Sequence, residues 1–306
     1  MNSSLIEQAA QRLEQLRQAG VTLPDQAPIQ VAVDAKPRTD VASSAADAPS
    51  QSKRVELDLA ALAVQGFLTP QAPRTQMADQ YRVIKRPLIK NAMGKGASSI
   101  NHANLIMVTS ALPGEGKSFT SLNLALSIAA ELDNTVMLVD ADVARPSVLR
   151  MLGLPQGPGL LDVLENSVDM ADVLLRTNVD KLTILPSGTP HAKATELLAS
   201  ESMSQLLEDM ANRYPDRIII FDSPPLLLTT EARVLATHMG QIVVVVQADN
   251  TPQSAVQQAI ATIEHCPVKL LLLNRARTSG GGAYGYGYGY GQTYGYGHED
   301  AASNAQ

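Results

Sequence analysis

The sequence has little of what marks a secreted, membrane-spanning or nucleic-acid-binding protein. One cysteine in 306 residues, Cys266, excludes a disulfide framework and indicates a reducing compartment. No apolar run approaches the roughly 18 residues of a membrane-spanning helix, and the N-terminus lacks the apolar core of a signal peptide. The net charge of −6 gives no basic footprint for nucleic acid. We therefore expect a cytoplasmic protein, recruited to the inner membrane face only through a partner.

Composition divides the chain into four parts. Residues 1–20 predict an amphipathic helix, which is either a docking segment or simply solvated. Residues 21–53 are rich in Pro, Ala, Ser, Asp and Gln and predict a disordered linker. A folded domain is expected over residues 54–277 and a flexible tail over residues 278–306. The apolar positions that follow helical spacing in the first part are Leu5, Ala9, Leu13 and Leu16.

In the folded part, apolar runs alternate with amphipathic helical patterns. The expected strands are Leu105–Ser110, Val136–Asp140, Leu182–Pro186, Ile218–Asp222, Ile242–Gln247 and Leu270–Asn274. The expected helices lie near Ser118–Leu132, Leu160–Glu165, Thr195–Tyr214, Glu231–Met239 and Pro252–His265. Continuous Val, Ile and Leu strands between such helices predict an α/β fold, a parallel sheet covered on both faces. Ligands of such sheets bind at the carboxyl ends of the strands.

A helical run precedes this alternating core. It spans Gln76–Asn91 and carries four cationic side chains, which are either solvated or pair with an acidic patch on a neighbouring subunit. They are Arg82, Lys85, Arg86 and Lys90.

The stretch Leu105–Ser121, LIMVTSALPGEGKSFTS, predicts a phosphate-binding loop. A buried strand, a glycine-containing turn and a helix N-terminus direct backbone N–H groups and the helix dipole at an anion. Lys117 adds a positive charge, and the Ser118 hydroxyl is a Mg²⁺ ligand in this pattern. Ala111 stands where the eight-residue pattern has its first glycine. The stretch predicts binding of a nucleoside triphosphate.

Carboxylates follow two of the other expected strands. VMLVD ends at Asp140, with Asp142 two residues further on, and IIIFD ends at Asp222. A carboxylate just past a buried strand is costly unless it faces a cation or a polar cleft. Three of them near a phosphate loop suit a Mg²⁺–nucleotide site. Asp222 is the natural metal ligand, and Asp140 or Asp142 can orient or deprotonate an attacking hydroxyl.

These motifs together resemble the bacterial tyrosine kinase family. The segments that carry the resemblance are ALPGEGKS (Ala111–Ser118), VMLVDADVARP (Val136–Pro146) and IIIFDSPP (Ile218–Pro225), which are similar to the family's Walker A, A′ and B motifs. The family implies a P-loop NTPase fold of the MinD/ParA-like type. The N-terminal region, with QYRVIKRPLI (Gln80–Ile89), resembles a stand-alone cytoplasmic subgroup associated with exosortase-linked exopolysaccharide loci.

The resemblance implies roles for individual residues. Lys117, Asp140 and Asp142 are expected to be catalytic, and Ser118, Asp140 and Asp222 to hold Mg²⁺. The expected ATP-binding residues are Pro113, Gly114, Glu115, Gly116, Lys117, Ser118, Phe119 and Asn274. The implied partners are further copies of the chain and a membrane polysaccharide co-polymerase that activates the kinase.

The chain departs from the family pattern at two places. Ala144 stands where the Walker A′ motif usually has arginine, so Arg145 is the alternative. In the oligomerisation helix, Asp79, Arg82 and Lys85 replace the usual Glu-x-x-Arg-x-x-Arg, and arginine and lysine are not interchangeable at bidentate contacts.

The tail contains six of the chain's eight tyrosines, alternating largely with glycine. Such a segment cannot bury a core. It is either a low-complexity segment that associates through tyrosine stacking or a cluster of phosphoacceptors. About 12 extended residues would reach roughly 40 Å, enough to cross to an adjacent subunit. The candidate acceptors are Tyr284, Tyr286, Tyr288, Tyr290, Tyr294 and Tyr296.

Three functions compete on the sequence. A tyrosine autokinase uses every feature above. A MinD/ParA-like positioning ATPase would carry a signature lysine five places before Lys117, where this chain has Leu112. A regulator that binds ATP only to assemble would have no need for the full set of Lys, Ser and Asp residues.

Overall fold

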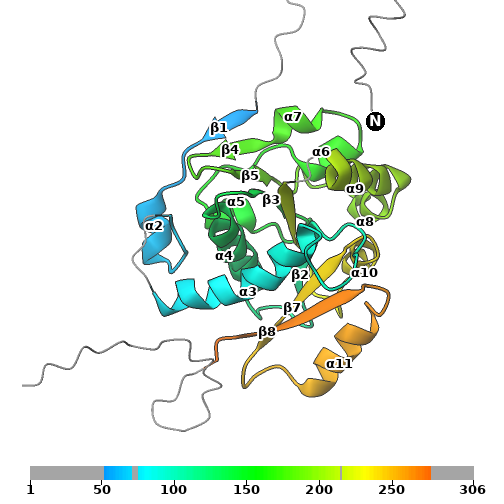
Figure 1. Cartoon of the computed structure of the whole chain (residues 1–306). Coiled ribbons are helices and arrows are strands. Elements are labelled where there is room, and N and C mark those ends of the chain that lie inside the picture. The colour runs from blue at the N-terminus through cyan, green and yellow to red at the C-terminus, as the bar shows by residue number, and fades with distance from the viewer. Residues whose placement is uncertain (1–51, 71–74, 214–215, 277–306) are drawn as a thin grey trace, which may run out of the picture. The chain divides into compact units, whose positions relative to one another are not determined.

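The computed structural model describes residues 52–70, 75–213 and 216–276 (Figure 1). The predicted N-terminal helix, nearly all of the predicted linker and the tyrosine tail lie outside the described residues. Lys53, placed in the linker by composition, instead begins the first strand, β1 (Lys53–Val55).

The described part contains one eight-stranded sheet, in the order β1-β4-β5-β3-β6-β2-β7-β8. Its central strands are β3 (Thr135–Asp140), β6 (Arg217–Asp222) and β2 (Leu105–Ser110), which pair in parallel. Next to β2, β7 (Gln241–Gln247) and β8 (Val268–Asn274) extend the parallel sheet to one edge. On the other side lie β5 (Leu182–Leu185), the short β4 (Leu175–Thr177) and β1.

Helices cover both faces of the sheet, as Figure 1 shows. One face packs on α2 (Leu59–Val64), α3 (Gln76–Ala92), α4 (Lys117–Ala129) and α5 (Val148–Met151). The other packs on α6 (Leu160–Leu164), α7 (Met170–Val173), α8 (Ala194–Leu198), α9 (Glu201–Arg213), α10 (Thr230–Ala236) and α11 (Gln253–Ala261). All six residues of β2 are buried, as a strand covered on both faces requires.

The predicted α/β fold is therefore confirmed, and six strands and most helices lie within a few residues of their expected positions. The run expected over Thr195–Tyr214 is wrong as a single helix, because α8 ends and α9 begins at Glu201. Ser200 causes the break: its Oγ accepts a hydrogen bond from the backbone N–H of Met203 at 3.2 Å. Serine in this position caps a new helix instead of continuing the old one.

Two expectations about the sheet also need correction. It is not wholly parallel, because β4 runs antiparallel to β5. The last strand is not covered on both faces, since exposure alternates along β8 and leaves Leu271 and Leu273 59% and 63% exposed. The Leu-rich run looked like an interior strand, but its place at the end of the strand order makes it an edge strand.

In the cationic helix α3, Lys85 is neither solvated nor free to pair with a neighbouring subunit, contrary to expectation. This side chain is buried, and its ammonium lies 2.6 Å from the Glu131 carboxylate and donates to the Ser127 carbonyl oxygen at 2.5 Å. Lys85 thus fastens α3 to the end of α4 within the chain and does not present its charge to a neighbour. Arg82, which is exposed, pairs with Asp79 one helical turn away.

In the ranges that the structure describes, none of the helices has the length and apolar character to cross a membrane.

Candidate nucleotide-binding and catalytic site

The phosphate-binding loop connects β2 to α4 at the carboxyl edge of the sheet. Gly114 and Gly116 have φ angles of 84° and 96°, in the left-handed region that favours glycine. Gly116 is also closely approached by the side-chain amide of Asn274, which donates to the Glu115 carbonyl oxygen at 2.8 Å. A β-carbon at position 116 would collide with that amide. The end of β8 therefore supports the loop directly, and α4 begins at Lys117, immediately after Gly116.

Glu115, predicted to bind the nucleotide, points into the protein. Its side chain is 1% exposed. The carboxylate accepts hydrogen bonds from the Leu112 backbone N–H at 2.6 Å and from the Thr251 hydroxyl. It thus ties the loop to the segment after β7, and its nucleotide role can come only through its backbone. Leu112 packs against the core on the α6–α11 side, so no lysine-like charge stands at this position.

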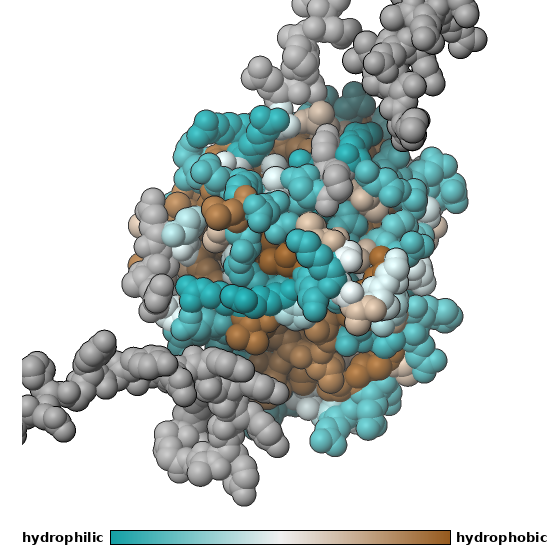
Figure 2. Space-filling model, in the orientation of Figure 1, coloured by the Kyte–Doolittle hydropathy of each residue, from teal (hydrophilic) through white to brown (hydrophobic). Residues whose placement is uncertain are grey.

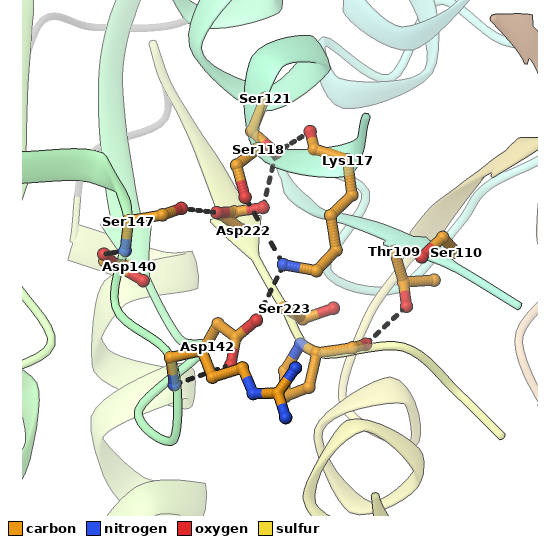
Figure 3. Close-up of polar contacts among 12 residues, drawn as sticks. Thr109, Ser110, Lys117, Ser118, Ser121, Asp140, Asp142, Ser147, Asp222 and Ser223 are labelled. Atoms are coloured by element: carbon orange, nitrogen blue, oxygen red, sulfur yellow. Dashed lines mark hydrogen bonds and ion pairs between the residues drawn. The ribbon is translucent and has the colours of Figure 1, made fainter. Parts of the chain in front are cut away.

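Lys117 and Asp142 form an ion pair in the centre of the site (Figure 3). The ammonium nitrogen lies 2.7 Å from Asp142 Oδ2 and 3.3 Å from the Ser118 hydroxyl oxygen. Burial alone would lower the pKa of Lys117, but the charges of Asp222, Asp142 and Asp140 outweigh it and raise the pKa. The lysine is therefore firmly cationic, held by carboxylates in a place where phosphates could replace them.

Asp140 and Asp222 lie side by side at the ends of β3 and β6, where they are register partners. Both are buried, and the hydroxyls of Ser121 and Ser147 lie 3.1 Å and 3.5 Å from the two Asp222 oxygens. Burial, followed by the charge of Asp222, raises the pKa of Asp140 to about 7. Burial also raises the pKa of Asp222, although Lys117 opposes the rise. The charge of Lys117 acts on both carboxylates, but its direct ion pair is with Asp142.

This arrangement fits a divalent cation. Asp140 Oδ2 accepts the backbone N–H groups of Ser147 and Val148 at 3.0 Å and 2.9 Å, while its Oδ1 is buried and has no hydrogen-bond partner. An orphaned carboxylate oxygen is the kind of atom that Mg²⁺ takes as a ligand. Within the described ranges, no three His, Cys, Asp or Glu side chains form a metal cage. The donor set therefore suits Mg²⁺ that retains waters and phosphate oxygens.

A cavity opens beside the loop and brings together part of the predicted set. Pro113, Gly114, Lys117, Ser118 and Asp142 line it, together with Arg145. Asp140 and Asp222 do not line it, but both contact Ser147, which does. Phe119 and Asn274 line a different cavity, although Asn274 also contacts the loop at Glu115. Phe119 packs against Phe67, with ring centroids 5.0 Å apart.

Several residues near the site were not predicted, and three of them carry polar or charged groups into it. Ser121 and Ser147 place hydroxyls on Asp222, and Arg150 lines the cavity. Ser121 lies one helical turn after Lys117, a spacing that could have indicated it. No pattern in the sequence points to Ser147 or Arg150. They reach the site because the segment between β3 and α5 turns back toward Asp140, which accepts hydrogen bonds from the backbone of Ser147 and Val148.

The fold and this site define a P-loop nucleotide-binding protein. Residues 103–273 match the family described as the AAA domain. The chain is 32% identical over 199 residues to the tyrosine-protein kinase YwqD of Bacillus subtilis, which covers 65% of this chain and 80% of that protein. This chain therefore belongs to the AAA domain family of P-loop proteins and, within it, to the bacterial tyrosine-protein kinases.

Other relatives differ in length. The tyrosine-protein kinase ptk of Acinetobacter johnsonii is 34% identical over 58% of this chain, but the match spans only 24% of that protein. Among solved structures, the kinase domain of VpsO is 28% identical, with a TM-score of 0.53, and the match covers 66% of this chain and all of that domain (100%). The similarity thus lies in the catalytic domain, and the longer relative contains much that this chain does not match.

Proposed function

We propose that this kinase is an autokinase, which transfers the γ-phosphate of Mg²⁺-ATP to tyrosines of its own C-terminal tail. The observation that carries the proposal is the contact between Lys117 and Asp142 at the cavity, together with the paired carboxylates of Asp140 and Asp222 whose charges act on Lys117. The six tail tyrosines supply acceptors in the same chain. Membership in the tyrosine-protein kinases supports the choice of tyrosine over water as acceptor.

The site residues divide the work. The loop backbone from Pro113 to Ser118 binds the β- and γ-phosphates, and the Ser118 hydroxyl, Asp140 and Asp222 would hold Mg²⁺. Bound there, Mg²⁺ would neutralise the negative charge that develops on the phosphate oxygens.

Lys117 acts as a switch between partners in this proposal. In the structure its charge is paired with Asp142. Phosphates that enter the loop compete for the ammonium, since they carry more charge than one carboxylate. Asp142, released at the wall of the cavity, then accepts the proton of the tyrosine hydroxyl as it attacks. Asp140, unlike Asp142, does not line the cavity, and it serves the metal instead.

Family resemblance extends the proposal beyond the chain. We infer trans-phosphorylation of tails in a homo-oligomer, activation by a membrane polysaccharide co-polymerase, and control of exopolysaccharide synthesis or export. The kinase would then work at the inner membrane face, held there by that partner. Full phosphorylation of six tyrosines would add roughly −9 to −12 charge, which would loosen an assembly of tails.

Phosphotyrosine mapping tests the proposal. The purified chain is incubated with Mg²⁺-ATP, with and without the activator's cytoplasmic segment, and compared with Lys117→Met and with a truncation after Arg277. We expect phosphate on the tail tyrosines of the wild type and none in Lys117→Met. An unmodified wild-type tail under both conditions would refute the autokinase. Hydrolysis of ATP that releases phosphate to water while the tail stays unmodified would favour a positioning ATPase.

A further inference from the structure

An apolar groove lies between helix α3 and the edge strand β8, next to the site described above, because Asn274 lines the groove and also contacts the phosphate loop at Glu115. Its walls are Met77, Ile84 and Pro87 from α3, Leu270 and Leu272 from β8, and Phe119 from α4. Figure 2 shows hydrophobic surface below α3 and over β8 on this side of the molecule. Val83, 72% exposed, lines the same groove. Among the described lining residues, Arg275 alone is charged.

The groove is bounded by an open sheet edge. β8 is last in the strand order and pairs only with β7 within the described part of the chain. Its second edge therefore offers backbone N–H and C=O groups to an added strand, which proteins usually cover or blunt. An extended, uncharged segment whose large and small side chains alternate would suit this surface. Its backbone would pair with the edge of β8, and its large side chains would fill the groove.

The chain itself continues from this groove. Ala276, the last described residue, lines it, and Arg275 turns the backbone there with a φ of 57°. After seven intervening residues, 277–283, the sequence reads YGYGYGY from Tyr284 to Tyr290, without a charge. A strand of this pattern places all four tyrosines on one face and glycine on the other. Its seven residues equal the length of β8.

We propose that Tyr284–Tyr290 docks on its own domain as a strand antiparallel to β8, with its tyrosine face in the α3–β8 groove. Residues 275–283 form the connection between the end of β8 and Tyr284. This connection is longer than a tight hairpin loop but shorter than the roughly 12–15 residues beyond which loops become uncommon. The tyrosine rings meet Leu270 and Leu272 across the ladder, as aromatic and aliphatic cross-strand pairs do. The groove is thus a holding site for the unmodified tail.

The N-terminal segment is the other candidate within the chain, and it fits less well. Its apolar residues repeat with helical spacing, and it carries Glu7, Arg12, Glu14 and Arg17. A helix cannot use the open backbone edge of β8. It also starts before β1, at the opposite end of the strand order, whereas the tail starts at the groove. The short connection gives the tail a high effective concentration there.

Docking has a regulatory consequence, which rests on the proposed autokinase function. Tyrosines held against α3 are withdrawn from the cavity that Asp142 lines. A phosphate on any of them adds about −1.5 to −2 charge, which an apolar groove does not solvate. Each phosphorylation therefore favours the released tail and makes the remaining tyrosines available.

Amide hydrogen exchange tests docking without nucleotide, so its outcome does not depend on kinase activity. We expect the amides of Val268–Asn274 that β7 leaves unpaired to exchange about tenfold slower in the full chain than in a truncation after Arg277, as a docked population of about 90% gives. Val83→Asp should abolish the difference. The matched control is Val64→Asp, because Val64 is 89% exposed and lies in α2, away from the groove.

Tyrosine fluorescence gives a second reading, because the chain has no tryptophan and six of its eight tyrosines lie in the tail. Acrylamide should quench the full-length wild type less than Val83→Asp. Equal exchange at β8 with and without the tail would overturn the proposal. Protection that disappears on dilution would also overturn it and identify a second copy as the occupant. Protection lost on deletion of residues 1–20, but not on truncation, would identify the N-terminal segment.

Discussion

Asp140 and Asp222 face each other across the β3–β6 ladder at the carboxyl edge of the sheet, both buried. Two neighbouring carboxylates in a buried site oppose each other's ionisation. Their proximity follows from the strand order, which sets β3 beside β6 although α5 to α9 lie between them in the chain. Ionisation of both carboxylates should therefore lower the free energy of unfolding.

Asp140→Asn should stabilise the protein in the absence of Mg²⁺ at neutral pH. The pKa of Asp140 rises from 3.8 to about 7 on folding, so between these values the folded state binds more protons than the unfolded one. The stability associated with this group is complete below about pH 4 and is lost as pH rises through about 7. The asparagine keeps a carbonyl oxygen for the N–H groups of Ser147 and Val148.

Thermal or urea unfolding in EDTA at pH 5 and pH 7.5 measures this effect. The advantage of Asp140→Asn over wild type should be larger at pH 7.5 by about 2 kcal/mol. Added Mg²⁺ should stabilise the wild type more than the variant. An advantage that does not change with pH, or that shrinks as pH rises, would contradict the coupling to Asp222.

Arg145→Ala should slow tyrosine phosphorylation, because Arg145 lines the cavity next to the position where the family pattern has arginine and this chain has Ala144. A cation aimed at charge that develops during phosphoryl transfer contributes roughly a hundredfold to kcat. Arg150→Ala tests the second cavity-lining cation, which sequence patterns did not indicate. Initial rates at varied ATP concentration separate kcat from KM.

Arg54→Ala is the control for both arginine variants, since Arg54 is exposed on β1, away from the cavity. An unchanged kcat in Arg145→Ala together with a large loss in Arg150→Ala would transfer the role to Arg150. Unchanged rates in both variants would remove arginine from the transfer step.

Lys85→Ala should destabilise the single chain by about 1–3 kcal/mol, because it removes a buried side chain that pairs with the partly exposed Glu131 and leaves the Ser127 carbonyl without its donor. Arg86→Ala, at an exposed position on the same helix, should change stability by less than about 0.5 kcal/mol. Denaturant unfolding gives the stability, and light scattering gives the oligomeric state. A change in assembly without a change in unfolding would mean that Lys85 acts between subunits.

The sequence alone was sufficient for the features that repeat or follow one another along the chain. Buried strands appear as continuous apolar runs, and the phosphate loop appears as a strand, two glycines, Lys117 and a helix. The end-of-strand position of Asp140 and Asp222 follows from the same runs. These features depend on local backbone geometry and on burial of a strand from both faces. Both are visible in the order of residue types along the chain.

Only the tertiary structure decided which side chains meet. The partner of Lys117 is Asp142, the carboxylate of Glu115 turns inward to Thr251, and Asn274 supports Gly116 from the far edge of the loop. The open edge of β8 and the burial of Lys85 were likewise decided only by the tertiary structure. Each contact joins residues that are distant in the chain, and the order in which the strands assemble brings them together. Such contacts leave no period in the sequence, because they depend on neighbours in space.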